Sequence, residues 1–212
     1  IMPITIKNTA GGGVTLDSTT SANETVNLPT GGGNLITTTG ATFTGNIATA
    51  GISAVTAGTS NFVAGVNAGN SITSGGNYNT VVGDEAGTAI TTGDNNVAVG
   101  YGSLVANTTG SANAAVGLSC LDSNTTGNHN NALGYLALQA NTTGSQNTAI
   151  GGTALYANTT ASDNTAVGYL ALYANTTGAN NVAIGVAALD ANTTGALNTG
   201  IGAYALSSNT TA

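Results

Sequence analysis

Small, branched aliphatic and polar residues alternate in a five-residue stretch that recurs along this chain every 17 residues. The repeat reads Asn-Thr-Ala-(Val/Ile/Leu)-Gly-x-x-Ala-Leu-x-Ala-Asn-Thr-Thr-Gly-x-x, and we number its positions 1 to 17. Alternation with a period of two is typical of a β-strand, so positions 1 to 5 predict one short strand per repeat. The asparagines at position 1 and the glycines at position 5 are Asn79, Gly83, Asn96, Gly100, Asn113, Gly117, Asn130, Gly134, Asn147, Gly151, Asn164, Gly168, Asn181, Gly185, Asn198 and Gly202.

A fixed period over many repeats predicts a stack in which each repeat buries its apolar face against its neighbours. We therefore expect an all-β fold, a parallel β-solenoid or β-roll of 17-residue coils that rises about 4.8 Å per coil. The branched aliphatic residue at position 4, from Val82 to Ile201, is expected to point into the coil. Ala and Gly at positions 3 and 5 would then face outward, towards something that approaches too closely for a larger side chain.

The remaining positions predict how the coil closes. The stretch Tyr-Leu-Ala-Leu-Tyr-Ala at 169–174 contains no β-branched residue and fits a helical turn as well as a second strand. We favour a second short strand or extended corner, because 17 residues barely accommodate a strand, two turns and a helix. The Asn-Thr-Thr-Gly segment predicts a turn, since Asn and Gly tolerate positive φ and Asn can bond its own backbone.

The chain divides into two regions. Residues 1–60 lack the period, and alternating stretches at 4–6, 14–16, 26–28 and 43–47, separated by Gly- and Thr-rich segments, predict short strands. We interpret 1–60 as a β-rich N-terminal fibre or attachment region. Residues 61–212 form the solenoid region, with a degenerate first coil at 61–78 that caps eight 17-residue repeats beginning at Asn79.

Composition adds an oligomeric expectation. Alanine supplies much of the hydrophobic content of 41%, and the chain has two Phe and no Trp, so the interior of each coil is thin. We therefore expect several chains to complete it, and the small face at positions 3 and 5 favours a homotrimeric fibre packed around a shared axis. The single cysteine excludes a disulfide framework.

Charge excludes several partners. Lys7 is the one basic side chain, against eight carboxylates and a net charge of -7. Nucleic-acid binding needs Lys and Arg to displace counterions, and docking on anionic membranes needs them too. We therefore expect no nucleic-acid partner. No apolar run reaches the length of a transmembrane helix, so we expect no membrane insertion either.

The potentially reactive residues do not assemble a site in the sequence. His129 lies in a variable turn without a second ligand, and Cys120 occupies the alanine slot at position 8 without a neighbouring base. Six carboxylates fall at variable positions that the pattern places towards solvent. The only adjacent pair among them, Asp84 and Glu85, is the alternative candidate for a weak calcium site. We predict no catalytic, cofactor-binding or metal-binding residues, and hence no enzyme.

Two further patterns have alternative interpretations. Tyr101, Tyr135 and Tyr169 at position 6, with Tyr156 and Tyr173 at position 10, could line a carbohydrate-stacking face or serve ordinary packing, which we favour. The Asn-Thr-Thr triplets match the N-glycosylation sequon seven times. Their fixed phase favours structural turns.

Two segments carry a resemblance to known families. Residues 164–171 and 181–185 resemble the Ala-Ile-Gly-x-x-Ala repeats of trimeric autotransporter adhesin heads. The longer form at 171–178, Ala-Leu-Tyr-Ala-Asn-Thr-Thr-Gly, is similar to repeats of bacteriophage tail-fibre and structural proteins, and residues 14–16, 26–29 and 40–47 are similar to Thr-rich segments of phage fibre shafts. The resemblance implies left-handed β-rolls packed as homotrimers.

These observations favour a structural fibre or shaft protein of a virion, such as a phage tail fibre or similar appendage. Its partners would be itself and other virion or appendage proteins, with a host-surface glycan if the shaft also adheres. The alternative is a bacterial surface adhesin or a self-assembling extracellular filament. A third hypothesis, an ice-binding solenoid, suits Thr-rich repeats, but Thr108 and Thr109 are adjacent and would point to opposite sides of a strand.

Overall fold

The computed structural model describes residues 7–8, 14–15, 52–53 and 58–211, and it divides the chain into two compact units, 1–45 and 46–212. In the first unit β1 (Lys7–Asn8) pairs antiparallel with β2 (Val14–Thr15). The strand β2 lies in the alternating stretch at 14–16. The strands expected at 4–6, 26–28 and 43–47 lie outside the described residues.

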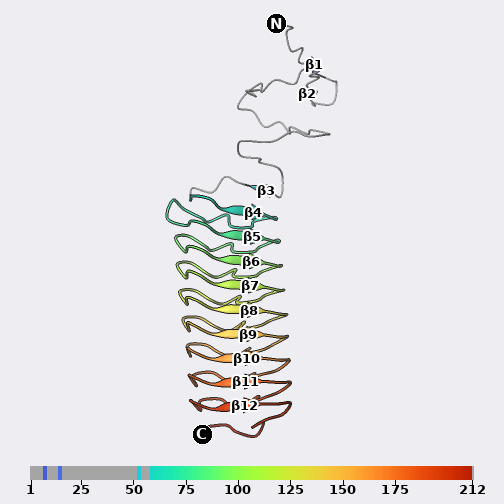
Figure 1. Ribbon diagram of the computed structural model, residues 1–212. Helices are drawn as coiled ribbons and strands as arrows, with labels where there is room; N and C mark the ends of the chain where they lie inside the picture. The colour runs from blue at the N-terminus through green and yellow to red at the C-terminus, as the bar shows by residue number, and fades with distance from the viewer. Residues whose placement is uncertain (1–6, 9–13, 16–51, 54–57, 212) are drawn as a thin grey trace. The chain divides into compact units, whose positions relative to one another are not determined.

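The second unit contains one ten-stranded sheet, in which nine strands are parallel and stacked in chain order (Figure 1). After β3 (Ile52–Ser53), which pairs antiparallel with β4, the parallel strands are β4 (Phe62–Ala64), β5 (Thr80–Val82), β6 (Val97–Val99), β7 (Ala114–Val116), β8 (Asn131–Leu133), β9 (Thr148–Ile150), β10 (Thr165–Val167), β11 (Val182–Ile184) and β12 (Thr199–Ile201). The described residues contain no helix.

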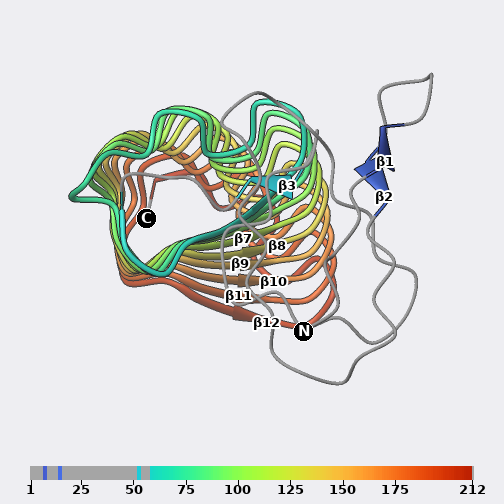
Figure 2. The same cartoon turned by 90° about the horizontal axis from the view of Figure 1, so that it is seen from above.

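The register of this sheet reproduces the sequence period. Thr80 of β5 pairs with Val97 of β6, and Val97 pairs with Ala114 of β7, so each partner lies one repeat further along the chain. Seen down the stack, the coils superpose (Figure 2). The predicted all-β parallel solenoid of 17-residue coils is confirmed. The first coil also joins the sheet, since Phe62 of β4 pairs with Thr80.

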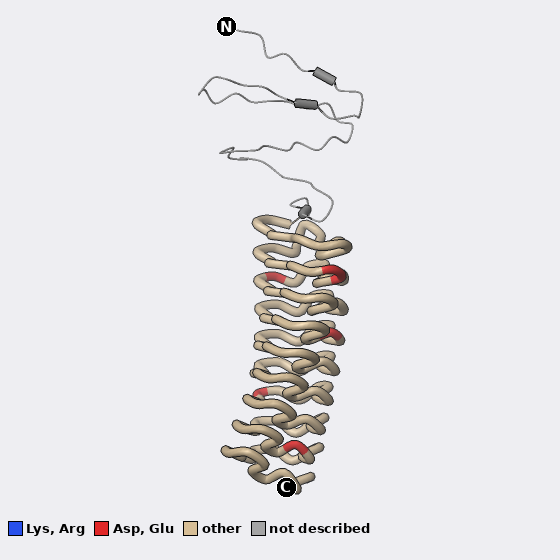
Figure 3. Tube along the Cα trace, turned by 90° about the vertical axis from the view of Figure 1, so that its right-hand side faces the viewer, with Lys and Arg blue, Asp and Glu red and all other residues tan. Residues whose placement is uncertain are grey.

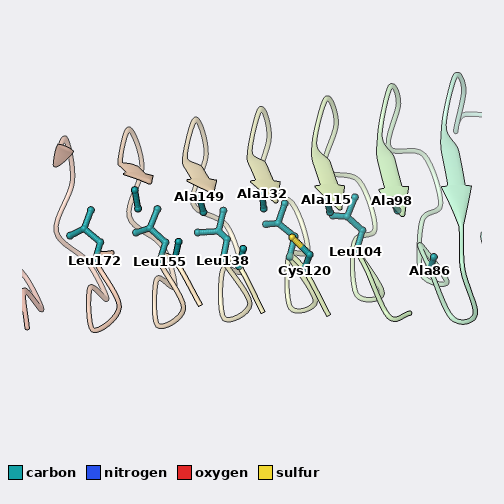
Figure 4. Close-up of a cluster of buried hydrophobic side chains, with 14 of the residues drawn as sticks. Ala86, Ala98, Leu104, Ala115, Cys120, Ala132, Leu138, Ala149, Leu155 and Leu172 are labelled. Atoms are coloured by element: carbon teal, nitrogen blue, oxygen red, sulfur yellow. The ribbon is translucent and has the colours of Figure 1, made fainter. Parts of the chain in front are cut away.

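The predicted orientation of the strand is wrong. Position 3 points inward and is fully buried, as at Val81, Ala98 and Ala115, whereas position 4 is on the outer face, where Leu133 is 50% exposed. In the coils from residue 96 onward, the leucine at position 9 explains the reversal. It enters the coil from the turn opposite the strand and is fully buried, so that only a small residue fits at position 3 (Figure 4).

The glycine at position 5 has a different reason from the one expected. Its φ lies between +118° and +140° throughout the stack, a region that side-chain-bearing residues avoid. A Cβ on Gly83 would also lie 2.7 Å from the carbonyl carbon and oxygen of Gly100 in the next coil. Stacking of successive coils within one chain therefore requires glycine here, without any approach from outside.

Positions 6 to 11 form tight turns, so the second strand or extended corner that we favoured is absent from the described coils. Leu104, Leu121 and their equivalents at position 9 adopt left-handed φ values near 50°. That conformation costs about 1–2 kcal/mol for a non-glycine residue. Full burial of a leucine side chain contributes about 1.5–3 kcal/mol, which offsets the strain. Sequence periodicity could not reveal this, because a left-handed leucine is favoured only once its tertiary pocket exists.

Candidate functional site

Two columns of buried asparagine side chains run along the inside of the solenoid. In the position-1 column the backbone N–H of Asn96 donates to Oδ1 of Asn79 at 2.9 Å, and Nδ2 of Asn96 donates to the carbonyl of Gly110 at 2.9 Å. In the position-12 column Nδ2 of Asn124 donates to Oδ1 of Asn107 at 2.8 Å and to the carbonyl of Gly127 at 3.1 Å. Both patterns repeat from coil to coil.

These ladders are structural. A buried amide without a partner costs about 1–3 kcal/mol, and each ladder satisfies its amides by passing hydrogen bonds to the next coil. Asn107 is fully buried and its Nδ2 donates to the carbonyl of Gly110, three residues on, so this sequon is closed to modification in the folded coil. The predicted bond from Asn to its own turn is confirmed. The positive φ expected at Asn107 and Gly110 is wrong, because the left-handed residues are at positions 7, 9 and 17, and in the earliest coil also at Ser60.

The two threonines of each turn face different ways. The hydroxyl of Thr108 at position 13 donates to the carbonyl of Thr125 at 3.1 Å, and this bond recurs along the column. Thr109 at position 14 is exposed, as are its equivalents. The exposed threonines therefore form one column, whereas an ice-binding face would need neighbouring columns on a flat surface.

In the part of the chain that the structure describes, the titratable groups do not gather into a reactive centre. His129 is exposed in a turn, and Cys120 is fully buried. Burial raises the pKa of the Cys120 thiol to about 12, so it is not a thiolate nucleophile at neutral pH. Within 58–211 no group of three His, Cys, Asp or Glu side chains could hold a metal ion. Figure 3 shows the acidic residues scattered along the solenoid.

Two of the acidic side chains join the first coil to the second. Asp84 Oδ1 accepts a hydrogen bond from the backbone N–H of Val66 at 3.1 Å, and Glu85 Oε1 accepts one from Nδ2 of Asn67 at 2.7 Å. The pair that was the calcium alternative is thus bonded to the preceding coil. Asp190 differs, because its Oδ1 is buried without a hydrogen-bond partner.

The outer surface carries one column of branched aliphatic side chains and a second, mixed column that includes three tyrosines. The first, the position-4 column, consists of Val82, Val99, Val116, Leu133, Ile150, Val167, Ile184 and Ile201. The second, the position-6 column, consists of Asp84, Tyr101, Leu118, Tyr135, Gly152, Tyr169, Val186 and Ala203. Tyr156 and Tyr173 at position 10 form a separate stacked pair with ring centroids 5.2 Å apart and planes 11° apart. Packing therefore accounts for this pair.

With this geometry the chain can be set against known proteins. Protein-family models, curated proteins and solved structures yielded no match. Function is therefore inferred from the columns themselves. Among the described residues, none forms a helix of the length and apolarity needed to cross a membrane.

Sequence reasoning missed the exposed position-4 column, because it placed these side chains inside. One signal was available: position 3 is Ala in most repeats while position 9 is Leu. Two large side chains from opposite walls cannot both fill so narrow a coil. With leucine inside at position 9, the small residue at position 3 fits inside and the branched residue at position 4 lies outside.

Proposed function

We propose that this chain is a structural shaft protein of a virion, in a tail fibre or similar appendage, and that it acts as a rigid spacer. Backbone ladders, the position-1 asparagine ladder and one threonine ladder join each coil to the next, and the position-12 asparagine ladder is added from Asn107 onward. A displacement of one coil would break bonds in all of these ladders together. Such a solenoid suits a spacer that holds the parts at its two ends at a fixed distance and orientation.

The single observation that carries this proposal is the exposed position-4 column. Its branched aliphatic side chains continue without interruption over eight coils, and Ile150 and Ile184 are 41% and 39% exposed. A continuous apolar stripe is characteristic of an interaction surface. Covering about half of such a side chain contributes roughly 1 kcal/mol.

A second copy of this chain suits the position-4 column best. It has the same rise per coil, so its aliphatic side chains repeat at the same interval along the stripe. The homotrimeric stoichiometry comes from the resemblance to adhesin heads, which pack as trimers. Such a trimer would cover the position-4 column, whereas the interior of each coil is already buried within one chain.

Light scattering coupled to size exclusion tests self-association. We expect three times the chain mass for the wild type and one chain mass for I150D/I184D, which introduces two charges into the position-4 column. The matched control is T143D/T177D, which introduces two charges into the exposed position-14 column with the same spacing and should keep the trimer. A wild-type protein that is monomeric at micromolar concentration would contradict the proposed assembly.

The location requires a separate measurement. Gold-labelled antibodies against the repeat should bind a filamentous appendage on virus particles in electron micrographs. Labelling of bacterial surfaces or free filaments would favour the adhesin or extracellular filament instead.

A further inference from the structure

Three tyrosines stand at even intervals on the position-6 column. Tyr101, Tyr135 and Tyr169 are 60%, 57% and 57% exposed, and each is separated from the next by two coils. The parallel register places equivalent residues directly above one another from coil to coil. The three rings therefore lie in one line along the solenoid.

The interval between these rings is set by the sheet. Two coils rise about 9.5 Å. This is close to the length of one disaccharide in an extended β-1,4-linked glycan, where the same ring face recurs at every second sugar. Tyrosine combines a broad apolar ring face with a polar hydroxyl, which suits stacking on a sugar ring.

The residues between the tyrosines are apolar or lack a side chain. Leu118 and Gly152 occupy the intervening coils, and neither carries a polar side chain. A Cβ on Gly152 would lie 3.5 Å from Cδ2 of Tyr169, so the ring of Tyr169 reaches back over the preceding coil. The surface between the rings is therefore apolar, with Leu118 47% exposed between Tyr101 and Tyr135 and no side chain at Gly152.

Charge narrows the ligand further. Residues 58–211 contain no Lys or Arg, and Figure 3 shows no basic residue along the solenoid. Asp84 occupies the N-terminal end of the position-6 column. A polyanion such as a nucleic acid or a sulfated glycan would meet no counter-charge here. The ligand that fits is electrically neutral.

We propose that Tyr101, Tyr135 and Tyr169 form a binding track for a neutral, extended β-1,4-linked glycan. The proposal rests on the shaft proposed above and names the ligand through which such a shaft would also adhere to a surface. A second copy of the chain fits this column less well than it fits the position-4 column. Self-association favours side chains of similar size on every coil, whereas here large rings alternate with Leu118, Gly152 and Val186.

Calorimetric titration of the full chain with three hexasaccharides tests the track. We expect binding of the β-1,4-linked glucose hexamer or the β-1,4-linked N-acetylglucosamine hexamer, which distinguishes the two sources of this linkage. The α-1,4-linked glucose hexamer, which coils, should not bind. The corresponding β-1,4-linked disaccharide should bind at least tenfold more weakly than its hexamer, because it reaches one ring only.

Substitutions then separate the ring positions from general surface effects. Y101A/Y135A/Y169A should weaken hexamer binding about tenfold or more, the range expected when aromatic stacking contacts are removed. The control Y78A/Y204A removes two exposed tyrosines outside the column and should bind like the wild type. L118Y/Y135L keeps three tyrosines in the column but makes their spacing unequal, and it should lose affinity as the triple variant does.

The results distinguish a glycan from a second copy of the chain as the occupant of the position-6 column. A wild-type chain that binds no β-1,4-linked hexamer, or an L118Y/Y135L variant that binds like the wild type, overturns the proposal. A triple variant with a lower mass by light scattering and unchanged glycan binding would assign the column to self-association. A monomeric wild type that still binds the hexamer would refute the proposed assembly and leave the glycan track supported.

Discussion

The two early coils, 61–95, and the later coils, from 96 onward, fill the same interior with different residues. The early coils carry Val at position 3, Gly at position 9 and Ile at position 12, as in Val81, Gly87 and Ile90. The later coils typically carry Ala, Leu and Asn at these positions. The backbone keeps its path, because φ at position 9 is 54° at Gly87 and 51° at Leu104.

The difference shows that the side chains at positions 3, 9 and 12 together fill the same interior volume in both kinds of coil. A Cβ on Gly87 would lie 2.8 Å from Cδ1 of Ile90 and 3.2 Å from Cγ1 of Val81, so these side chains occupy the space that a later coil gives to leucine. When leucine enters at position 9, position 3 shrinks to alanine and position 12 becomes a ladder asparagine. The coil shape therefore depends on the ladders and turns, and several residue sets can fill it.

The largest expected effect on stability concerns the glycine at position 5, which both kinds of coil share. Gly134→Ala would place a Cβ 2.6 Å from the carbonyl oxygen of Gly151, at a φ of 140°. We expect a loss of at least about 3 kcal/mol in the free energy of unfolding, because backbone atoms of the next coil cannot yield. Chemical denaturation measures this. Gly152→Ala in the adjacent coil is the control, since its Cβ would make only ordinary contacts.

A second test converts an early coil into a later one. Gly87→Leu alone should cost about 1–3 kcal/mol through overpacking against Ile90 and Val81. The triple change V81A/G87L/I90N should recover most of that loss, because it restores the volume and adds one amide to the position-12 ladder. A thermodynamic cycle by chemical denaturation measures the coupling. Additive effects would show that the two residue sets are not interchangeable.

The smallest expected effect concerns position 8, where both kinds of coil carry a small residue. Cys120→Ala should cost less than about 1.5 kcal/mol at pH 7, since alanine occupies this slot in most coils. Burial raises the thiol pKa from 9.0 to about 12, so the folded state retains a proton that the unfolded chain releases above pH 9. Stability relative to C120A is therefore fully present below pH 9 and should fall by about 1 kcal/mol at pH 10. Equal pH dependence of the two proteins would contradict a buried thiol.

The same residues explain how far the sequence could be interpreted. The 17-residue period predicted the parallel stack, its register and the strand in each coil, because hydrogen-bonded ladders require equivalent residues at equal intervals. Alternation at 80–82 defined two faces of the strand but not which face is inside. The inward face is the smaller one, since Leu104 and its equivalents fill the coil from the opposite wall.

For the tyrosines too, the sequence gives one part of the information and the structure the other. The spacing of Tyr101, Tyr135 and Tyr169 can be counted in the sequence, whereas their exposure and their common line needed the coil geometry. The stacked pair Tyr156 and Tyr173 has the same composition and a different environment. Residue type alone could not distinguish a packed ring from an exposed one.

The sequence by itself determined the repeat length, the parallel β-solenoid and the near absence of positive charge, because periodicity and composition act through local and nearest-neighbour interactions. The tertiary structure alone decided which strand face is buried, that position 9 is left-handed, and that an aliphatic column remains outside. These features depend on competition for one narrow interior between side chains from opposite walls. A linear pattern records which residues compete, and only the folded coil shows which of them is buried.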